Sequence, residues 1–294
     1  MTTKLTFIHA LSPLHAGTGQ GIGVIDLPIA REKATNIPFL PGSSLKGALR
    51  DLCEDEATRK RVFGPETTNA EAHSGSAVFS DHRLLLLPTR SLRGTFAWAT
   101  SPYALQRFRR DVEGAGLDVS ALPDMAVAKD DECLIASQGS LLTNQDGGIY
   151  LEDFDLKGNL DEKVDKWASF IGEKVFEKDE NWRKALTARL CVLNDNVFNF
   201  LLEHGTEITA RIRLKEDTKT AAIGALWYEE ALPPETILSG LLVAVKGKAT
   251  PEEVFATVDG ILKQHPAIQL GGKATVGRGL CRIPPLSDWK GATK

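Results

Sequence analysis

Strand-like and helix-like segments alternate in this chain in an order that few folds accommodate. Residues 4–10 alternate apolar and polar side chains, which is typical of a strand with one buried face. Residues 42–65 then show helical spacing, a serine N-cap and a Gly-Pro stop. Two strands, 77–88 and 95–100, precede a second helix that opens at 101–102. This order predicts an α+β fold with an antiparallel sheet and helices on one face, as in ferredoxin-like folds.

The middle of the chain carries a separate pattern. Residues 133–142 and 149–156 are predicted to form two strands about an Asn-Gln-Asp-Gly-Gly turn. An amphipathic helix is predicted near 160–176, because its apolar residues recur on one stripe. We expect this region to be an appendage of the main sheet.

The last third of the chain predicts a β-hairpin. Residues 207–215 alternate apolar and polar side chains and face 221–228 across a polar turn, long enough for the hairpin to protrude. A helix capped by Thr250 follows, and strands at 267–270 and 280–283 flank a glycine-rich loop.

Charge divides the chain into three parts. Residues 1–110 carry 14 Lys and Arg against 9 Asp and Glu, residues 111–180 carry 6 against 18, and residues 181–294 carry 15 against 12. Because electrostatic attraction is screened within about 10 Å at 0.1 M salt, a basic face can bind RNA while an acidic segment lies elsewhere. Solvated charge without a partner explains the same composition equally well.

Composition bounds the class of protein. The chain has 294 residues, 42% of them hydrophobic, which is enough for one large or two smaller domains. Its four cysteines form no CxxC pair, so we expect reduced core residues in a cytoplasmic protein. The longest apolar stretch, 236–245, is about half the length of a membrane span, and no signal peptide is expected.

Glycines recur at 17, 19, 21 and 23, but familiar nucleotide-binding motifs do not fit. A dinucleotide fingerprint needs a helix directly after the glycines, and Val24–Pro28 follows instead. A Walker loop fails near Gly272-Lys273, because Ala274 follows the lysine. A flexible backbone of this kind lets a polymer lie close, with N–H groups that can face phosphates, although a plain turn-rich connection is the simpler interpretation.

The segment after Pro41 predicts an anion site. A helix start offers unpaired N–H groups, and Lys46 and Arg50 project from the same face four residues apart. Gly42, Ser43 and Ser44 form the opening of this helix. An ordinary capped surface helix is the alternative.

Asp26 is an acid in an apolar, strand-like stretch. It either caps the following turn or lies beside a phosphodiester, where a carboxylate can hold a divalent cation or orient a ribose 2′-hydroxyl. The glycine loop can fold His15 back toward Asp26, although a lone histidine is more often structural. Glu229 and Glu230 follow the hairpin, where a solvated hairpin end is the simple interpretation.

These segments together resemble a known family. The N-terminal block from His15 to Arg50, the stretch LWYEEALPPETILSGLL and the late GGKATVGRG resemble the RAMP superfamily of CRISPR proteins. More narrowly, they are similar to the repeated backbone subunit of type III-B (Cmr) RNA-targeting complexes. The type III-A backbone RNase shares the N-terminal motif but is shorter, and WYEEALPPET favours III-B.

The resemblance implies an architecture and partners. It implies an RRM-like (ferredoxin-like) palm, whose N-terminal part in 1–110 contains the glycine loop and the phosphate-binding helix. Residues 111–180 are expected to form an acidic insert or helical finger. Residues 181–294 are expected to form a β-hairpin thumb and the C-terminal completion of the palm. The thumb is placed near 211–228. Copies are expected to stack into a helical filament along the guide RNA, with other Cmr subunits and target RNA as partners. The acidic insert is expected to face neighbouring subunits or solvent.

The resemblance also implies site residues. Asp26 matches the catalytic aspartate and the expected Mg²⁺ or Mn²⁺ ligand, and cleavage is expected to leave a 2′,3′-cyclic phosphate. His15 and Glu229 match positions around the active site, with Glu230 as the alternative to Glu229. The guide-binding positions, expected to contact phosphates rather than bases, are Gly42, Ser43, Ser44, Lys46, Arg50, Gly272, Lys273 and Arg278. A scaffold that coats guide RNA without cutting is the competing hypothesis, and a nucleotide-dependent enzyme is disfavoured by the failed motifs.

Overall fold

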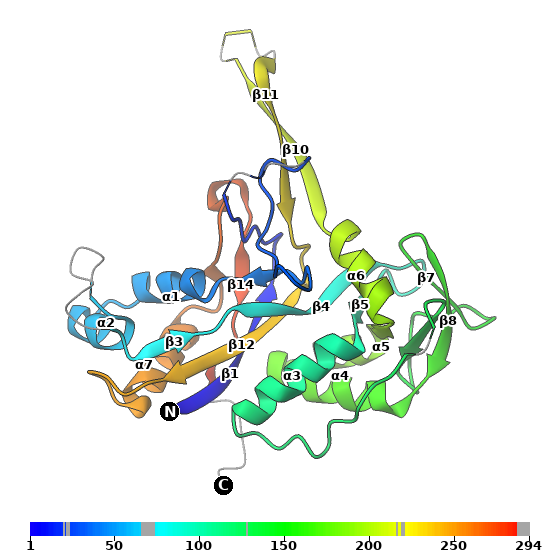
Figure 1. Cartoon of the computed structure of the whole chain (residues 1–294), viewed down its shortest axis with the longest axis horizontal. Helices are drawn as coiled ribbons and strands as arrows, with labels where there is room; N and C mark the ends of the chain where they lie inside the picture. Colours follow the sequence, from blue (N-terminus) through cyan, green and yellow to red (C-terminus); the bar gives the residue numbers. More distant parts are fainter. Residues whose placement is uncertain are drawn as a thin grey trace.

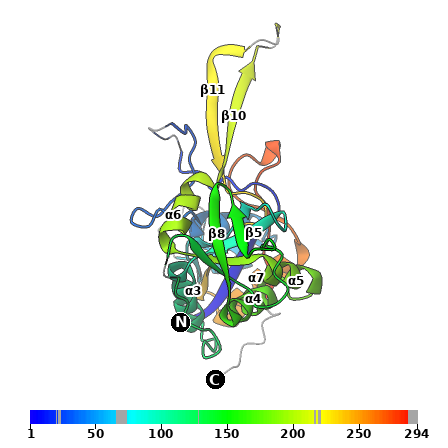
Figure 2. The same ribbon diagram turned by 90° about the vertical axis from the view of Figure 1, so that its right-hand side faces the viewer.

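The computed structural model describes residues 1–19, 21, 24–65, 74–127, 129–215, 217–218 and 221–286. One large sheet forms the body, and a two-stranded hairpin extends away from it (Figures 1 and 2). None of the described helices is long and apolar enough to cross a membrane.

The sheet has twelve strands in the order β13-β14-β1-β12-β4-β5-β9-β6-β8-β7, with β2 beside β4 and β3 beside β12. Most neighbours are antiparallel, while β5 with β9 and β6 with β8 are parallel. The strands are β1 (Thr2–Ala10), β2 (Phe39–Leu40), β3 (Ala77–Phe79), β4 (His82–Arg90), β5 (Phe96–Thr100), β6 (Glu132–Ile135), β7 (Gly148–Leu151), β8 (Phe154–Leu160), β9 (Leu190–Leu193), β12 (Ile237–Ala244), β13 (Ile268–Gln269) and β14 (Leu280–Arg282). The mixed α+β class and a mostly antiparallel sheet are therefore confirmed.

Helices cover both faces of this sheet, so the prediction of one helical face is wrong. In β1, Leu5 and Phe7 join one hydrophobic cluster while Ile8 and Ala10 join another. The first cluster also includes side chains of α3 and α4, and the second includes side chains of α1, α6 and α7. The helices are α1 (Gly42–Asp51), α2 (Glu56–Phe63), α3 (Pro102–Gly114), α4 (Glu162–Val175), α5 (Glu180–Arg189), α6 (Asp195–His204) and α7 (Pro251–Gln264), with a 3₁₀ turn, η2 (Ala274–Val276).

The acidic insert belongs to the sheet and is not appended to it. β6 pairs with β9, and β8 pairs with β6, so the insert continues the main sheet. The hairpin predicted about 144–148 is wrong, because β7 pairs instead with β8 across the tighter turn at Glu152 and Asp153. Sequence reasoning missed α5, β9 and α6, although α4 matches the predicted amphipathic helix.

The predicted helix over 42–65 is two helices. Asp55 caps α2 by accepting a hydrogen bond of 2.7 Å from the N–H of Thr58, and this competes with continuation of α1. The serine N-cap is also wrong, because Pro41 occupies the N-cap position of α1 without a side-chain hydrogen bond. The stop at Gly64 is confirmed, as are α3 capped by Ser101 and α7 capped by Thr250.

The predicted hairpin is confirmed as β10 (Glu207–Leu214) and β11 (Ala221–Ala231), which pair antiparallel and project from the body (Figures 1 and 2). The segment 211–228, predicted as the thumb, lies within it. β11 continues past Tyr228, so Glu229 and Glu230 lie inside the strand and are each 2% exposed. The interpretation of these glutamates as a solvated hairpin end is therefore wrong.

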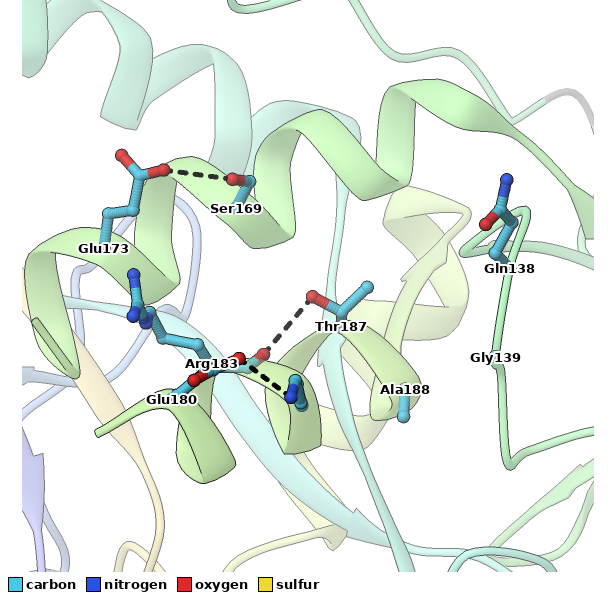
Figure 3. Close-up of a pocket in the computed structure, with 9 residues that line it drawn as sticks. Gln138, Gly139, Ser169, Glu173, Glu180, Arg183, Thr187 and Ala188 are labelled. Carbon is cyan, nitrogen blue, oxygen red and sulfur yellow. Dashed lines mark hydrogen bonds and ion pairs between the residues drawn. The ribbon is translucent and has the colours of Figure 1, made fainter. Parts of the chain in front are cut away.

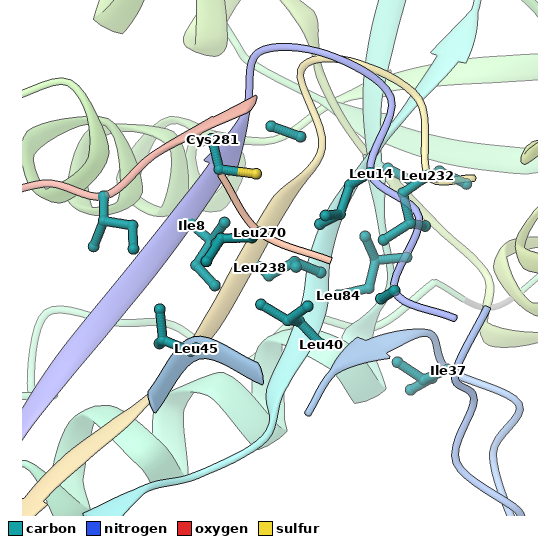
Figure 4. Packing of buried hydrophobic residues seen from close by; sticks show 14 of the residues in the cluster. Ile8, Leu14, Ile37, Leu40, Leu45, Leu84, Leu232, Leu238, Leu270 and Cys281 are labelled. Carbon is teal, nitrogen blue, oxygen red and sulfur yellow. The ribbon is translucent and has the colours of Figure 1, made fainter. Parts of the chain in front are cut away.

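Loops beside the hairpin base are anchored in the core (Figure 4). Leu14, Leu232 and Leu270 are fully or almost fully buried in one cluster with Ile8 and Leu238 of the sheet. Leu14 and Leu232 also exchange backbone hydrogen bonds of 2.8 and 2.9 Å. The residues that follow each leucine are thus held close to β11.

Candidate functional site

Asp26 lies on the loop between β1 and β2 and not on a strand. Pro28, two residues later, has no N–H to donate to regular strand pairing. Its side chain is exposed. Oδ2 accepts a hydrogen bond of 2.7 Å from the backbone N–H of Tyr228, 202 positions away. The carboxylate therefore binds the base of the hairpin, and this bond is not the local turn cap considered from the sequence.

The residues after Asp26 run alongside β11. Leu27 donates its N–H to Tyr228 O at 3.1 Å, and Glu230 donates its N–H to Leu27 O at 3.0 Å. Leu27 and Glu229 form a parallel bridge. This short ladder fixes the position of Asp26 along the strand.

His15 contacts the same strand. Its Nδ1 lies 2.7 Å from the carbonyl oxygen of Glu230, and its own carbonyl accepts the N–H of Gly272 at 3.0 Å. Tyr228 and Glu230 are two residues apart, which is roughly 7 Å along a strand. The loop after β1 thus brings His15 and Asp26 to neighbouring positions on β11, with Asp26 exposed and His15 buried.

Gly17 is required beside the His15 ring. A Cβ at this position would lie 2.5 Å from Nε2 of His15, closer than any side chain can pack. The glycine therefore keeps the backbone close to the imidazole.

Glu229 is held by cations from two other segments. Its carboxylate lies 2.7 Å from Lys273 Nζ and 3.3 Å from Arg211 Nε, and it accepts the indole N–H of Trp227 at 2.8 Å. Burial raises the pKa of Glu229, but the bonds to Lys273 and Trp227 and the Arg211 charge outweigh it and lower the pKa to about 2. Glu229 is thus an ionised anchor between β10, β11 and the C-terminal loop.

Glu230 is equally occupied. Oε1 accepts hydrogen bonds from Arg31 at 2.5 Å and from Thr206 at 3.0 Å, while Oε2 accepts the N–H of Ile29 at 3.0 Å. Both glutamates predicted as catalytic candidates therefore have carboxylates that are buried and already bonded within the protein.

A groove of about 630 Å³ lies between α1, the loop after β1 and the loop that precedes η2. Its lining includes Gly17 of the glycine loop. It also includes three of the predicted guide-binding residues, namely Ser43, Ser44 and Gly272. Gly47 also lines it, and a Cβ there would meet open space. Asp51 adds one acid to the lining.

Other predicted binding residues lie differently. Gly42 is buried against β3, and its N–H donates to the Asp81 carboxylate at 2.9 Å, so the first helix-start donor is already taken. Arg50 donates to the carbonyl of Gly64. Arg278 is 5% exposed and donates to Thr209 Oγ1 at 2.9 Å, so its side chain is buried, and its assignment to a guide-binding loop stays a prediction.

Lys46 differs from these cations. Its side chain is half-buried on α1, and burial together with the Arg50 charge lowers its pKa. In the described part of the chain no hydrogen bond or ion pair engages its ammonium group. Lys273, by contrast, is paired with Glu229.

Two residues of this site could not be identified from the sequence. Tyr228 acts through its backbone N–H, which no side-chain motif signals. Arg31 lies five residues after Asp26 and binds Glu230, yet a single arginine in a polar loop carries no distinctive pattern.

A second pocket of about 530 Å³ is lined by α4, α5 and the loop after β6 (Figure 3). It contains both acids and cations, and several are bonded locally. Glu173 accepts from Ser169 at 3.2 Å, and Glu180 pairs with Lys184 at 2.8 Å. This mixed, internally paired charge does not form a path for a polyanion.

No group of three or more His, Cys, Asp and Glu side chains is placed to hold a metal ion within the described ranges. Glu229 and Glu230 are occupied by bonds to the protein. Asp26, with one oxygen bonded to Tyr228, is the exposed carboxylate at the hairpin base.

Comparison with known proteins gives a consistent result. The family model described as the RAMP superfamily matches residues 7–282. The CRISPR system Cmr endoribonuclease Cmr4 of Pyrococcus furiosus is 34% identical over 304 residues, covering 96% of this chain and 95% of that protein. The CRISPR system Cms endoribonuclease Csm3 of Mycobacterium tuberculosis is 33% identical over 96 residues, covering 26% of this chain and 39% of that protein.

Solved structures share the fold. The crystal structure of oligomeric Cmr4 from Pyrococcus furiosus aligns with a TM-score of 0.73 at 27% identity, covering 97% of both chains. A chain of the type III-B Cmr-beta complex bound to cognate target RNA aligns with a TM-score of 0.74 at 21% identity, covering 98% of both chains.

Proposed function

The chain belongs to the RAMP superfamily, and we propose that it is the guide-RNA-binding backbone subunit of a type III-B (Cmr) CRISPR complex and the endoribonuclease that cuts complementary target RNA. One observation carries the proposal: the exposed Asp26 carboxylate is fixed to the base of a projecting hairpin. The segment that follows Asp26 bridges at Ile29 to Gly17, which lines the groove beside α1. The relative with 34% identity over nearly its full length is named a Cmr endoribonuclease.

Asp26 is proposed as the group that takes the proton of the ribose 2′-hydroxyl. Its Oδ2 is fixed by the N–H of Tyr228, which leaves Oδ1 to accept the hydroxyl proton. The 2′-oxygen then attacks the adjacent phosphorus, and the P–O5′ bond breaks. The products are a 2′,3′-cyclic phosphate and a 5′-hydroxyl.

His15 is proposed as the partner that supplies a proton to the departing 5′-oxygen. A carbonyl oxygen only accepts hydrogen bonds, so Nδ1 carries a hydrogen that it donates to Glu230 O. The doubly protonated ring gives the proton on Nε2 to the 5′-oxygen and is left as the neutral imidazole. Glu229 and Glu230 are proposed to support the reaction by holding the surrounding segments, because their own oxygens are occupied.

A divalent metal ion, Mg²⁺ or Mn²⁺, is proposed as the cofactor. Asp26 would hold it with RNA phosphates and water while also serving the hydroxyl, because each carboxylate oxygen has two lone pairs. Mg²⁺ is commonly bound through one or two carboxylates plus substrate phosphates. When bound, the ion would neutralise the negative charge that develops on the phosphate oxygens.

The groove beside α1 is proposed to carry the guide backbone. Gly17, Gly47 and Gly272 let a strand approach the backbone, and Ser43 and Ser44 offer hydroxyl and N–H donors. These groups recognise phosphates and sugars without reading bases, as a guide of any sequence requires.

The hairpin is proposed to act as the thumb that enters the guide–target duplex. Its cross-strand pairs place Ile208, Ile212, Leu226 and Tyr228 on one face, and each of these side chains is at least 38% exposed. The other face carries Arg211 and Trp227. An apolar face suits contact with unstacked bases.

Assembly and compartment follow from the same proposal. The 27% identical Cmr4 structure is described as oligomeric, which supports self-association into a filament together with other Cmr subunits. The acidic insert is proposed to face those neighbours or solvent. All four cysteines are buried free thiols, which suits a cytoplasmic protein.

Reconstitution with a guide and a complementary RNA tests the proposal. We expect cuts at regular intervals with 2′,3′-cyclic phosphate ends, and we expect a target with 2′-deoxyribose at the cut positions to resist. A target that binds but remains whole would leave only the scaffold role. Normal cutting of the deoxy target would assign the nucleophile to water or another group.

A further inference from the structure

We propose that Arg31 is a positioning residue for target cleavage, acting through Glu230 to hold the Asp26 carboxylate in its reactive place; this inference rests on the function proposed above. Arg31 contacts neither Asp26 nor the groove. Its side chain is 17% exposed and lies on the loop that carries Asp26.

Arg31 joins three separate segments through one guanidinium group. It donates to Glu230 Oε1 of β11 at 2.5 Å, to the carbonyl of Leu202 near the end of α6 at 2.7 Å, and to the carbonyl of Asn36 at 3.1 Å. The planar guanidinium spreads its donors in a fixed fork, so these three acceptors determine its orientation.

Glu230 transmits that orientation to the loop. One oxygen is held by Arg31 and by Thr206 Oγ1, which directs the other oxygen to the N–H of Ile29 at 3.0 Å. The carboxylate is 3% exposed, so water does not compete freely for these bonds.

The segment from Asp26 to Ile29 is thereby held at both ends by carboxylates. Asp26 accepts the N–H of Tyr228 at one end, and Glu230 accepts the N–H of Ile29 at the other. Between them, Leu27 bonds to Tyr228 O and receives the N–H of Glu230. Arg31 fixes the Ile29 end of this segment through Glu230. The register of Leu27 on β11 therefore depends on Arg31, and so does the position of Asp26.

Lysine cannot replace this arginine. An ammonium group is a single point that cannot reach acceptors on β11, α6 and the loop together. Loss of Arg31 also leaves Glu230 as a buried charge without its cation, which favours movement of the strand or the loop. A displacement of about 1 Å at a reacting group lowers a rate by roughly 100-fold.

The test compares Arg31→Lys with wild type in the reconstituted complex, using single-turnover cleavage at saturating target RNA and separate titrations of target affinity. We expect the cleavage rate to fall by about 10- to 100-fold while target affinity changes by less than about twofold. Arg61→Lys is the matched control, because Arg61 also joins distant segments by pairing with Glu253 at 2.6 Å, and it should cut at the wild-type rate.

Glu230→Gln provides a second measurement should Arg31→Lys fail to fold. Its amide oxygen can still accept one of the native hydrogen bonds, but it has no charge for Arg31. We expect a similar loss of rate, and the double variant should lose little more than either single variant, because both changes break one link.

Several outcomes overturn the inference. Wild-type cleavage by Arg31→Lys does so, and so does a loss of target affinity as large as the loss of rate, since that indicates a general structural role. Rate losses that multiply in the double variant also contradict the proposed link. Asp26→Asn, run in parallel, separates the two proposals: wild-type cleavage by that variant defeats the catalytic assignment itself.

Discussion

The Asp26 carboxylate accepts a hydrogen bond of 2.7 Å from the backbone N–H of Tyr228, although 202 positions separate the two residues. This bond joins the loop after β1 to the base of the hairpin. It fixes one carboxylate oxygen and leaves the exposed side chain able to bind a ligand through the other. A group held in this way is oriented before RNA arrives.

Asp26→Asn should therefore separate binding from chemistry. The amide oxygen can still accept the N–H of Tyr228, so the loop should stay in place, but the neutral side chain cannot take a proton from the 2′-hydroxyl. We expect cleavage of bound target to fall by at least about 100-fold without loss of target affinity. Single-turnover assays and binding titrations measure the two quantities. Asp155→Asn, an exposed acid of β8, should cut normally.

Glu229→Gln should destabilise the hairpin base. The change removes the negative charge that faces Lys273 and Arg211 and leaves these cations beside a neutral buried amide. We expect the free energy of unfolding to fall by about 1–3 kcal/mol, measured by denaturant titration. Glu180→Gln removes an exposed pair with Lys184 and should leave the free energy of unfolding nearly unchanged. Equal losses in the two variants would contradict the anchoring role of Glu229.

His82 should make stability depend on pH. It is fully buried between Thr6 Oγ1 at 2.6 Å and Ser80 O at 3.0 Å, and burial lowers its pKa to about 4. Between pH 6.5 and 4 the unfolded chain binds a proton that the folded protein does not. The free energy of unfolding should therefore fall as pH drops through this window, by up to about 3 kcal/mol.

A non-titrating variant isolates this contribution. His82→Gln should flatten the pH dependence between 6.5 and 4, whatever its absolute stability. Glu32 and Glu229, whose pKa values are lowered to about 2, lose their contribution only below their ordinary value of 4.5. An unchanged slope in His82→Gln would assign the effect to other groups.

Local sequence signals correctly predicted the segments whose ends are marked by capping or turn residues. Ser101 and Thr250 cap α3 and α7 with their side chains, and the polar turn before Ala221 joins a clear pair of alternating strands. These local signals failed where contacts between distant segments determine which strands pair. β8 lies between β6 and β7, and this arrangement depends on contacts that no window of sequence contains.

In the candidate site, too, the sequence identified residues but not their contacts with distant parts of the chain. Asp26 and His15 stand out in the sequence as polar residues beside a glycine loop, and the structure brings both to β11. Glu229 and Glu230 also stand out, but their burial against Lys273 and Arg31 was invisible because the partners lie far apart in the chain. Arg278 was assigned to a guide-binding loop by resemblance, and the sequence did not show that its side chain turns inward to Thr209.

Lys46 and Arg50 are alike in sequence but differ in their partners. Lys46 has no partner within the described segments, whereas Arg50 donates to the carbonyl of Gly64 where α2 ends. Lys46→Gln should weaken guide binding about equally for every guide sequence, because a phosphate contact carries no sequence information. The slope of log affinity against log salt should shrink by about 0.7, the value for one phosphate of a single strand.

Arg50→Gln is the matched comparison on the same helix. Losing the bond to Gly64 should lower the free energy of unfolding by about 1 kcal/mol, while the salt slope of guide binding stays at its wild-type value. Guide titrations at several salt concentrations and denaturant unfolding distinguish the two variants. If Lys46→Gln affects one guide sequence alone, the lysine contacts a base. If the two variants reduce the salt slope equally, Arg50 releases Gly64 and binds phosphate when the guide is present.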